Sequence, residues 1–199
     1  MTPFTVHTGI AASMPAPNVD TDVIMPKQFL KRIDRAGLAE GAFHDLRQDP
    51  GFVLNREPWS DASILICGEN FGCGSSREYA VWGLMQWGIR VIVAPSIAGI
   101  FFGNCEKNGL LAITLPPDDV AALATLAADP ATVEFEVDLP AQAIRHARGE
   151  TSFDIPQARK TLLMEGKDHV ARTLEHENDI AAYEAARLQP APRLSSRIA

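Results

Sequence analysis

The chain has 199 residues, which suits one domain or one domain with an appendage. Its hydrophobic content of 46% with 22% charged residues is ordinary for a soluble globular protein. The formal net charge of −7, with no basic block to offset it, argues against a nucleic-acid or membrane-surface binder, and no apolar run approaches the ~18 residues of a membrane-spanning helix. The first residues lack the basic and long apolar stretches of a signal peptide, so we expect a cytoplasmic protein.

The first half of the chain alternates short apolar runs with stretches rich in glycine and proline. In chain order we predict a weak strand at residues 4–10, a loop at 11–17, a turn at 18–26 and a long, partly ordered segment at 36–58. A buried strand at 62–67 and a helix at 79–87 follow. Gly88 is the expected end of that helix. The long segment is of a kind that is often functional in compact domains.

The alternation continues to residue 128 and then changes character. We predict a strand at residues 89–94, a helix at 97–108, a strand at 110–115 and a helix at 118–128. Ser96 is the expected N-cap of the first helix and Gly109 its end. Beyond Pro130 we predict a half-exposed strand at 133–137 and a hairpin formed by 143–146 and 152–155. A short helix at 156–164 and two helical pieces at 168–174 and 180–188 follow. Strands that alternate with helices predict an α/β fold with a parallel sheet core in a domain at 1–188, and we expect 189–199 to be a disordered tail.

Residues 18–26 carry two carboxylates, Asp20 and Asp22, on either side of a threonine. Asx and threonine side chains bond the local backbone, so one interpretation is a turn with helix-capping residues. The other interpretation is that Asp20 and Asp22 orient a catalytic group and that the basic tip that follows reaches a substrate. Composition alone leaves both interpretations open.

A glycine-rich stretch stands between the predicted buried strand and the helix that follows it. It reads Gly68-Glu69-Asn70-Phe71-Gly72-Cys73-Gly74-Ser75-Ser76-Arg77-Glu78. Gly72 and Gly74 let the backbone turn tightly and approach a ligand. Ser75, Ser76 and Arg77 arrive where the helix begins and where backbone N–H groups would face the same spot. A serine N-cap is one interpretation, but the two hydroxyls and the guanidinium together favour an anion site for a carboxylate or phosphate.

Better-known glycine and nucleophile patterns do not fit this loop. No Gly-Lys-Ser/Thr follows at the spacing of a Walker A loop. The dinucleotide fingerprint needs a third glycine where Arg77 stands, and the Gly-x-Ser-x-Gly of a nucleophile elbow is absent. The three cysteines, Cys67, Cys73 and Cys105, form no C-x-x-C pair, so we expect no disulfide framework and no metal bound by this chain.

Several segments carry a resemblance to a known family. They read Asn70-Phe71-Gly72-Cys73-Gly74-Ser75-Ser76-Arg77-Glu78, Asp20-Thr21-Asp22-x-Ile24-x-Pro26-Lys27-Gln28-Phe29-Leu30, Ile100-Phe101-Phe102-Gly103-Asn104, Thr173-Leu174-x-His176 and Ile180-Ala181-Ala182-Tyr183-Glu184. Together they resemble the small-subunit family of 3-isopropylmalate dehydratase over nearly the whole chain, apart from the last ten or so residues. The glycine–serine–arginine motif is shared more widely, with the swivelling domain of aconitases.

This resemblance implies a fold, a partner and a reaction. The fold is a swivelling β/β/α domain of the aconitase C-terminal type, which closes over a large subunit that holds a [4Fe–4S] cluster. The two subunits form a lyase that converts 2-isopropylmalate to 3-isopropylmalate through isopropylmaleate, in leucine biosynthesis. The substrate is a small dicarboxylate, and the small subunit is inactive alone. The cysteine count agrees, because the three thiols of this chain cannot ligate the cluster.

The resemblance also implies roles for individual residues. Ser75 would be the base that removes a proton from carbon, and Arg77 would bind a substrate carboxylate with Ser76 in support. Serine is a poor base in water, so helix N-terminal amides and Arg77 would have to stabilise its anion. The substrate's variable side group would be sensed by the loop at Leu30, Lys31 and Arg32.

Two positions depart from the family pattern. The family usually has histidine after the Arg-Glu pair and proline two positions later, whereas this chain has Tyr79 and Val81. Tyrosine keeps a hydrogen-bonding group but loses a proton carrier near neutral pH. This leaves open a paralogous hydro-lyase for a smaller acid of the 2-methylmalate or citraconate type. A carboxylate- or phosphate-binding module without catalysis is the alternative from another class.

Overall fold

A seven-stranded sheet organises the part of the chain that the structure, a computed structural model, describes: residues 1–31 and 35–187. Its strands are β1 (Val6–Met14), β2 (Ala62–Cys67), β3 (Val91–Ala94), β4 (Leu111–Thr114), β5 (Glu134–Asp138), β6 (Ala143–His146) and β7 (Gly149–Ser152). Their order across the sheet is β4-β3-β2-β1-β5-β6-β7. The α/β fold predicted from the sequence is therefore confirmed.

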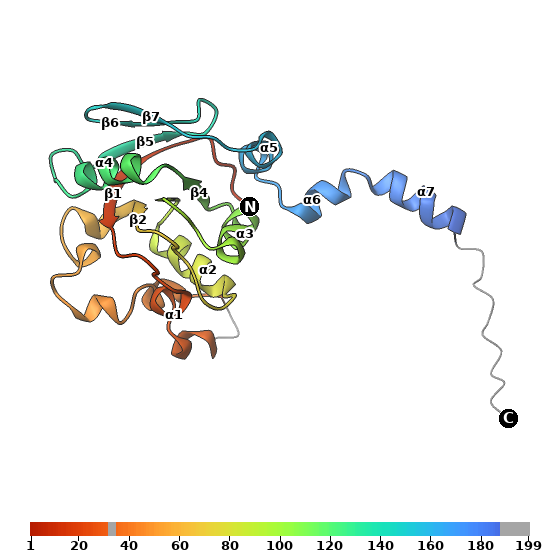
Figure 1. Cartoon of the computed structure of the whole chain (residues 1–199). Coiled ribbons are helices and arrows are strands. Elements are labelled where there is room, and N and C mark those ends of the chain that lie inside the picture. The colour runs from red at the N-terminus through yellow and green to blue at the C-terminus, as the bar shows by residue number, and fades with distance from the viewer. Residues whose placement is uncertain (32–34, 188–199) are drawn as a thin grey trace.

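Strand β1 is the boundary between two kinds of strand pairing (Figure 1). It pairs with β2 in parallel, and the parallel pairing continues through β3 to β4. On its other edge β1 pairs with β5 in antiparallel fashion, and β6 and β7 extend that half as a hairpin. Because β1 to β4 all run the same way, the chain leaves each of them at the same edge of the sheet.

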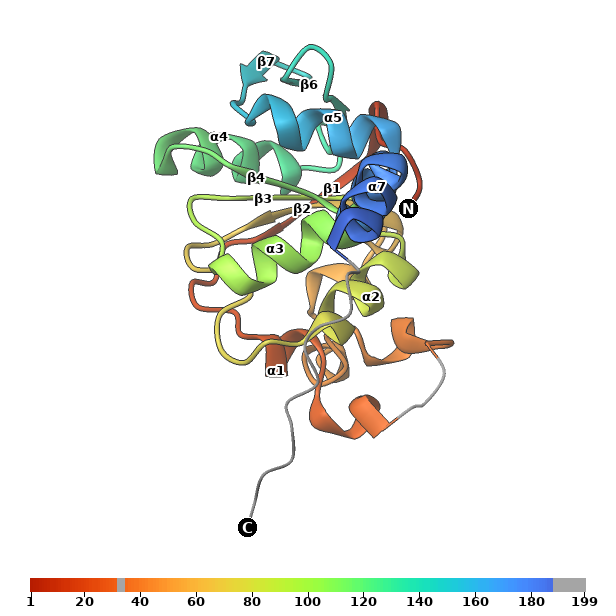
Figure 2. The same ribbon diagram turned by 90° about the vertical axis from the view of Figure 1, so that its right-hand side faces the viewer.

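Helices cover both faces of the parallel strands (Figure 2). The helices are α1 (Thr21–Ile24), α2 (Glu78–Trp87), α3 (Gly99–Asn108), α4 (Pro117–Ala127), α5 (Gln157–Glu165), α6 (His169–Leu174) and α7 (Glu177–Arg187). Side chains of α2 and α3 pack with Leu65 and Ile92 on one face, whereas α4 packs with Ile64 and Ile66 on the other. Strands buried on both faces read as continuous apolar runs, which is why these segments were recognisable from the sequence.

The chain between α1 and β2 forms a series of single turns of 3-10 helix beside α2. These turns are η1 (Lys27–Lys31), η2 (Leu38–Gly41), η3 (Leu46–Gln48), η4 (Val53–Asn55) and η5 (Trp59–Asp61). Leu38, Phe43 and Leu54 from this stretch belong to the same apolar cluster as α2. The indole of Trp59 donates a hydrogen bond of 2.7 Å to the carbonyl of Ala127 at the end of α4. Buried side chains thus fix much of a segment that the sequence predicted to be only partly ordered.

Helices α6 and α7 extend away from the rest of the molecule (Figure 1). Neither of them contains a buried residue, and large apolar side chains such as Val170 and Tyr183 are more than half exposed. The tail predicted at 189–199 lies outside the described residues. Across the described ranges, no helix has the length and apolar character needed to span a membrane.

Three local predictions are wrong. The first strand runs over Val6–Met14, so the loop predicted at 11–17 begins only after Met14. Ala11 and Ala12 are fully buried there, because small side chains fit between the sheet and the layers on its two faces. The second hairpin strand is Gly149–Ser152 and not 152–155, because the turn is confined to residues 147–148. Ser96 does not cap α3: the N-cap is Ala98, and Ser96 bonds the glycine loop instead.

The close approach of the chain after β1 to the chain after β2 gives a testable prediction. A Cβ atom at Gly68 would lie 2.4 Å from the carbonyl oxygens of both Pro15 and Ala16. We therefore expect Gly68→Ala to lower the free energy of unfolding by about 1–3 kcal/mol, since backbone cannot move aside cheaply. Urea unfolding of the purified chain measures this quantity.

The matched control is Gly103→Ala in the middle of α3. A Cβ atom there meets nothing within 4 Å. Alanine should therefore raise the free energy of unfolding by about 0.5–1 kcal/mol through helix propensity. Equal effects of the two substitutions would contradict the close approach at Gly68.

Candidate active site

The connections that leave β1, β2 and β3 meet at the shared carboxyl edge of the parallel strands. Single backbone bridges join Asp20 to Cys73 and Phe71 to Ile97. Ser96 accepts twice from the glycine loop, at its hydroxyl from the N–H of Asn70 (2.9 Å) and at its carbonyl from the N–H of Phe71 (3.1 Å). Ligands of open α/β sheets bind outside the carboxyl ends of the strands, so this edge is where a site is expected.

Two glycines give the loop its shape. Gly72 has φ +73° and Gly74 has φ +89°, in the left-handed region that favours glycine. A Cβ atom at Gly72 would also lie 2.3 Å from the ring of Phe101. The N–H of Gly72 donates to the carbonyl of Val19 at 2.8 Å, which ties the loop to the segment after β1. Gly72 and Gly74 thus both adopt the tight turn for which glycine was predicted.

Consecutive residues 20, 21 and 22 contact alternate residues 73, 75 and 77 of the loop. Asp20 forms the backbone bridge with Cys73, and the N–H of Thr21 donates to the carbonyl of Cys73 at 2.9 Å. The hydroxyl of Thr21 donates to the carbonyl of Ser75 at 2.8 Å. Arg77 donates through Nη1 to the carboxylate of Asp22. Segment 20–22 therefore positions both the serine and the arginine.

The two carboxylates make different contacts in this arrangement, and the orientation of a catalytic group by them stays a prediction. Asp20 is a helix cap: its Oδ1 accepts from the N–H of Val23 at 2.8 Å and it is the N-cap of α1. Asp22 instead forms an ion pair with Arg77, whose side chain is 11% exposed. Arg77 also donates through Nη1 to the carbonyl of Met25 at 3.3 Å. A guanidinium fixed in this way is preorganised to receive an anion on its remaining N–H groups.

The two serines lie at the open side of the site. Ser75 and Ser76 are exposed, and the N-cap of α2 is Arg77, whose side chain makes no capping bond. A serine N-cap is therefore not what this loop provides. The hydroxyls stand just before the positive end of the α2 dipole, which favours negative charge at this place.

Two of the three residues expected to sense a substrate side group belong to the described part of the chain. Leu30 is half-buried against the α2 side of the core, and Lys31 is exposed at the end of η1. Within the described ranges, no hydrogen bond or ion pair links either of them to the glycine loop. Arg32 lies outside the described residues.

The first turns of α2 contain the two departures from the family pattern. Tyr79 is half-buried, and its ring centroid lies 4.9 Å from that of Trp82. Val81 is fully buried in the core, so it has no direct part in a site. Asn108 at the end of α3 holds this part of α2: it donates to the carboxylate of Glu78 at 2.8 Å and accepts from the indole of Trp82 at 2.9 Å. The supporting contacts of Thr21, Ser96 and Asn108 could not be predicted, because their partners are distant in sequence.

The cysteines do not form a ligand set for an iron–sulfur cluster. Burial raises the pKa of the thiols of Cys67 and Cys105 well above the ordinary range, which disfavours the thiolate that a metal needs. No group of three or more histidine, cysteine, aspartate or glutamate residues in the described ranges could hold a metal ion. Residues 1–31 and 35–187 therefore offer no set of side chains that fits such a cluster.

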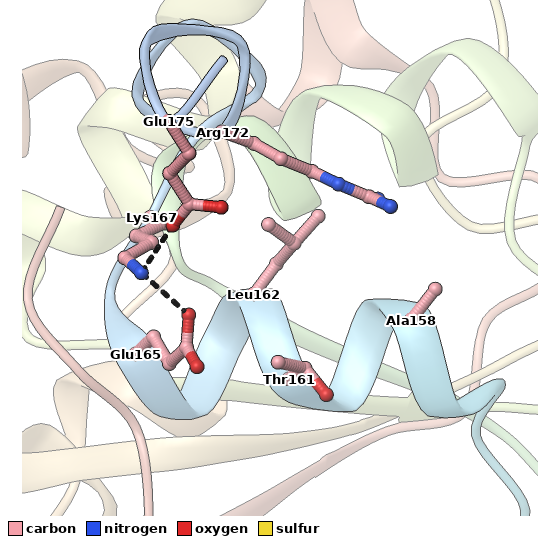
Figure 3. Close-up of a pocket in the computed structure, with 7 residues that line it drawn as sticks. All are labelled: Ala158, Thr161, Leu162, Glu165, Lys167, Arg172 and Glu175. Carbon is pink, nitrogen blue, oxygen red and sulfur yellow. Dashed lines mark hydrogen bonds and ion pairs between the residues drawn. The ribbon is translucent and has the colours of Figure 1, made fainter.

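A hollow of about 270 Å³ lies elsewhere, between α5 and α6 (Figure 3). It is lined by Ala158, Thr161, Leu162, Glu165, Lys167, Arg172 and Glu175. Lys167 bonds both Glu165 and Glu175, so its charge is already compensated. The lining residues come from the C-terminal helices and include none of the glycine loop, so this hollow is separate from the candidate active site.

Comparisons with known proteins agree with this geometry. The family model of the aconitase C-terminal domain matches residues 1–118, and that of the C-terminal domain of the 3-isopropylmalate dehydratase small subunit matches residues 171–197. A 3-isopropylmalate dehydratase small subunit 1 from Mannheimia succiniciproducens is 46% identical over 98% of this chain and 99% of its own length. The chain belongs to the family of 3-isopropylmalate dehydratase small subunits.

Other members of the family show the same near-complete match. A 3-isopropylmalate dehydratase small subunit from Dinoroseobacter shibae is 48% identical over 93% of this chain and 96% of that relative. The crystal structure of a 3-isopropylmalate dehydratase from Methanocaldococcus jannaschii superposes with a TM-score of 0.66 at 26% identity, over 90% of this chain and 99% of that one. The predicted family and fold are confirmed, whereas the roles of individual site residues remain predictions.

The pair of Asp22 and Arg77 yields a prediction that needs no substrate. A double-mutant cycle of Asp22→Ala and Arg77→Ala should give a coupling of at least about 1 kcal/mol in the free energy of unfolding. The reason is that the guanidinium is largely buried and loses its charged partner when Asp22 is truncated. The control cycle uses Lys167 and Glu175, an exposed pair on the C-terminal helices, and should give a clearly smaller coupling. A coupling near zero for Asp22 and Arg77 would show that segment 20–22 does not hold the arginine.

Proposed function

We propose that the chain is the small subunit of a two-subunit hydro-lyase that interconverts 2-isopropylmalate and 3-isopropylmalate through isopropylmaleate in leucine biosynthesis. The observation that carries this proposal is identity of 45–48% along nearly the whole chain with proteins named as 3-isopropylmalate dehydratase small subunits. The arrangement of Ser75 and Arg77 at the carboxyl edge of the sheet supports it with a chemically suitable site.

Arg77 has the geometry of a carboxylate clamp. Its Nη1 is occupied by Asp22 and Met25, so Nη2 and Nε are the donors that would bind a substrate carboxylate. A proton next to a carboxylate is weakly acidic, and a fixed cation stabilises the negative charge that builds up as the proton leaves. The rigid attachment to Asp22 would keep this cation in place throughout the reaction.

Ser75 would be the base that takes the proton from carbon. In the forward direction the Oγ alkoxide would accept that proton, the electron pair of the C–H bond would form the carbon–carbon double bond, and the C–O bond on the adjacent carbon would break. The departing hydroxide and the proton held on Oγ together make up the water that is lost. Addition of water with the opposite regiochemistry then gives the isomer. The Ser75 alkoxide would be stabilised by the start of α2 and by Arg77, with Ser76 in support.

The proposal includes a partner and a location. The cysteines of this chain do not form a cluster site, so the [4Fe–4S] cluster would belong to a large subunit that completes the active site. Residues 1–188 would act as the swivelling domain that closes over that subunit, and Leu30, Lys31 and Arg32 would meet the side group of the substrate. The complex would work in the cytoplasm on a small dicarboxylate, with no role for nucleic acid or membrane.

Tyr79 favours a second candidate, a related hydro-lyase for a smaller hydroxy-acid. It is half-buried at the first turn of α2, two residues beyond Arg77, where the family usually has histidine. Its ring packs against the ring of Trp82, which restricts the side-chain conformations open to Tyr79. The ratio of turnover with 2-isopropylmalate to turnover with 2-methylmalate, measured on one reconstituted complex, separates the two candidates.

The decisive substitution is Ser75→Ala in the complex with a cognate large subunit. Turnover, followed under anaerobic conditions by the absorbance of isopropylmaleate, should fall by ~10² or more, because the proton acceptor is lost. The control is Ser152→Ala on β7, an exposed serine in the antiparallel half, which should leave turnover unchanged. Failure of the wild-type chain to give activity with any cognate large subunit would sink the proposal. Retention of activity by Ser75→Ala would remove only the role of this serine.

A further inference from the structure

Thr21 is a buried polar residue whose hydrogen-bonding groups are directed at the site. It is 2% exposed, although its neighbours Asp20 and Asp22 are half-buried. Its N–H donates to the carbonyl of Cys73 at 2.9 Å, and its hydroxyl donates to the carbonyl of Ser75 at 2.8 Å. Its own carbonyl accepts from the N–H of Met25 at 2.9 Å, within the turn of α1. One residue therefore connects α1 to the loop on both sides of Gly74.

We propose that Thr21 is a positioning residue for the reaction assigned above, and that its hydroxyl fixes the backbone of Ser75 relative to Arg77. This inference rests on the proposed function for its catalytic consequence, but its structural part does not. Thr21 itself does not touch the reacting atoms. It acts through the carbonyl of Ser75, the group that the hydroxyl holds.

The need for such a bond comes from the composition of the loop. Gly72 and Gly74 both stand just before Ser75 and have positive φ angles, and glycine has the widest choice of backbone conformations. Ser75 and Ser76 are exposed, so side-chain packing does not hold them. A hydrogen bond from a buried, fixed hydroxyl compensates for that freedom, because it orients the peptide group to which the Ser75 Cα belongs.

Arg77 is fixed by a different contact. Its guanidinium is held by Asp22 and by the carbonyl of Met25, neither of which involves the Thr21 hydroxyl. Removal of that hydroxyl should thus disturb the base while leaving the carboxylate clamp in place. The expected signature is a loss in kcat with little change in KM. A general loss of stability would also lower the apparent kcat, through a smaller folded fraction, so rescue by Thr21→Ser and the local exchange of residues 73–77 separate the two cases.

The test compares three variants in the reconstituted complex with the large subunit. Thr21→Val keeps the shape of the side chain but leaves the Ser75 carbonyl without its donor, and should lower kcat ~10–100-fold with KM within about threefold of wild type. Thr21→Ser restores the hydroxyl and should keep kcat within about threefold of wild type. Thr132→Val is the matched control, because the Thr132 hydroxyl also donates to a backbone carbonyl at 2.8 Å, that of Leu126, far from the loop in the fold. It should leave kcat unchanged.

Amide hydrogen exchange of residues 73–77 in the same complex gives a readout that does not depend on turnover. Exchange should be faster in Thr21→Val than in wild type and unchanged in Thr21→Ser and Thr132→Val. If the wild-type complex shows no turnover, the proposed function fails while the exchange comparison still decides whether Thr21 fixes the loop. Wild-type kcat in Thr21→Val, equal losses in Thr21→Val and Thr21→Ser, or failure of Thr21→Val to fold would each overturn the inference, the last because it would make Thr21 a residue of general stability.

Discussion

The parallel pairing of β1 with β2 is the constraint on which the site depends. The register ends with Met14 opposite Cys67, and the N–H of Gly68 donates to the carbonyl of Met14 at 3.0 Å just beyond it. Two connections therefore leave the sheet side by side, one with the paired aspartates and one with the glycine loop. An antiparallel arrangement would place them at opposite edges. Every contact between segment 20–22 and the loop follows from this direction of pairing.

Hydrophobic pattern identified most of the fold because the parallel strands are buried on both faces. Residues 62–67 and 79–87 were predicted as a strand and a helix, and β2 and α2 occupy nearly those bounds. The pattern failed at residues 11–14, where two alanines and a serine give no β signal although the backbone is paired with β2. Pairing partners decide the conformation there, and they are not visible in local sequence.

In the candidate site, too, features set by neighbouring residues could be predicted, whereas contacts between distant residues could not. The glycines, serines and arginine of the loop were identifiable because their chemistry is concentrated in one stretch. The attachment of Arg77 to Asp22 and the Ser96 bonds to the loop could not be predicted, because the partners are 55 and 26 residues apart. Helix capping and the orientation of a catalytic group were posed as alternatives for Asp20 and Asp22. The structure shows the cap at Asp20 and an ion pair with Arg77 at Asp22, whereas the orienting role stays a prediction.

Those distant attachments also affect the order in which the molecule can acquire its parts. The hydrogen bond from Thr21 to Ser75 joins residues 54 positions apart in the sequence. The chain between them, which includes the turns η1 to η5, must form a closed loop before this bond can form. Contacts of long sequence separation form slowly, because loop closure costs chain entropy before the contact repays it. The helices α2 to α4 and their strands rely on nearer neighbours. Strands β2 to β4 can thus pair before β1 joins the sheet between β2 and β5. Substitutions in segment 20–22, which follows β1, would therefore affect a later stage of folding than the first collapse.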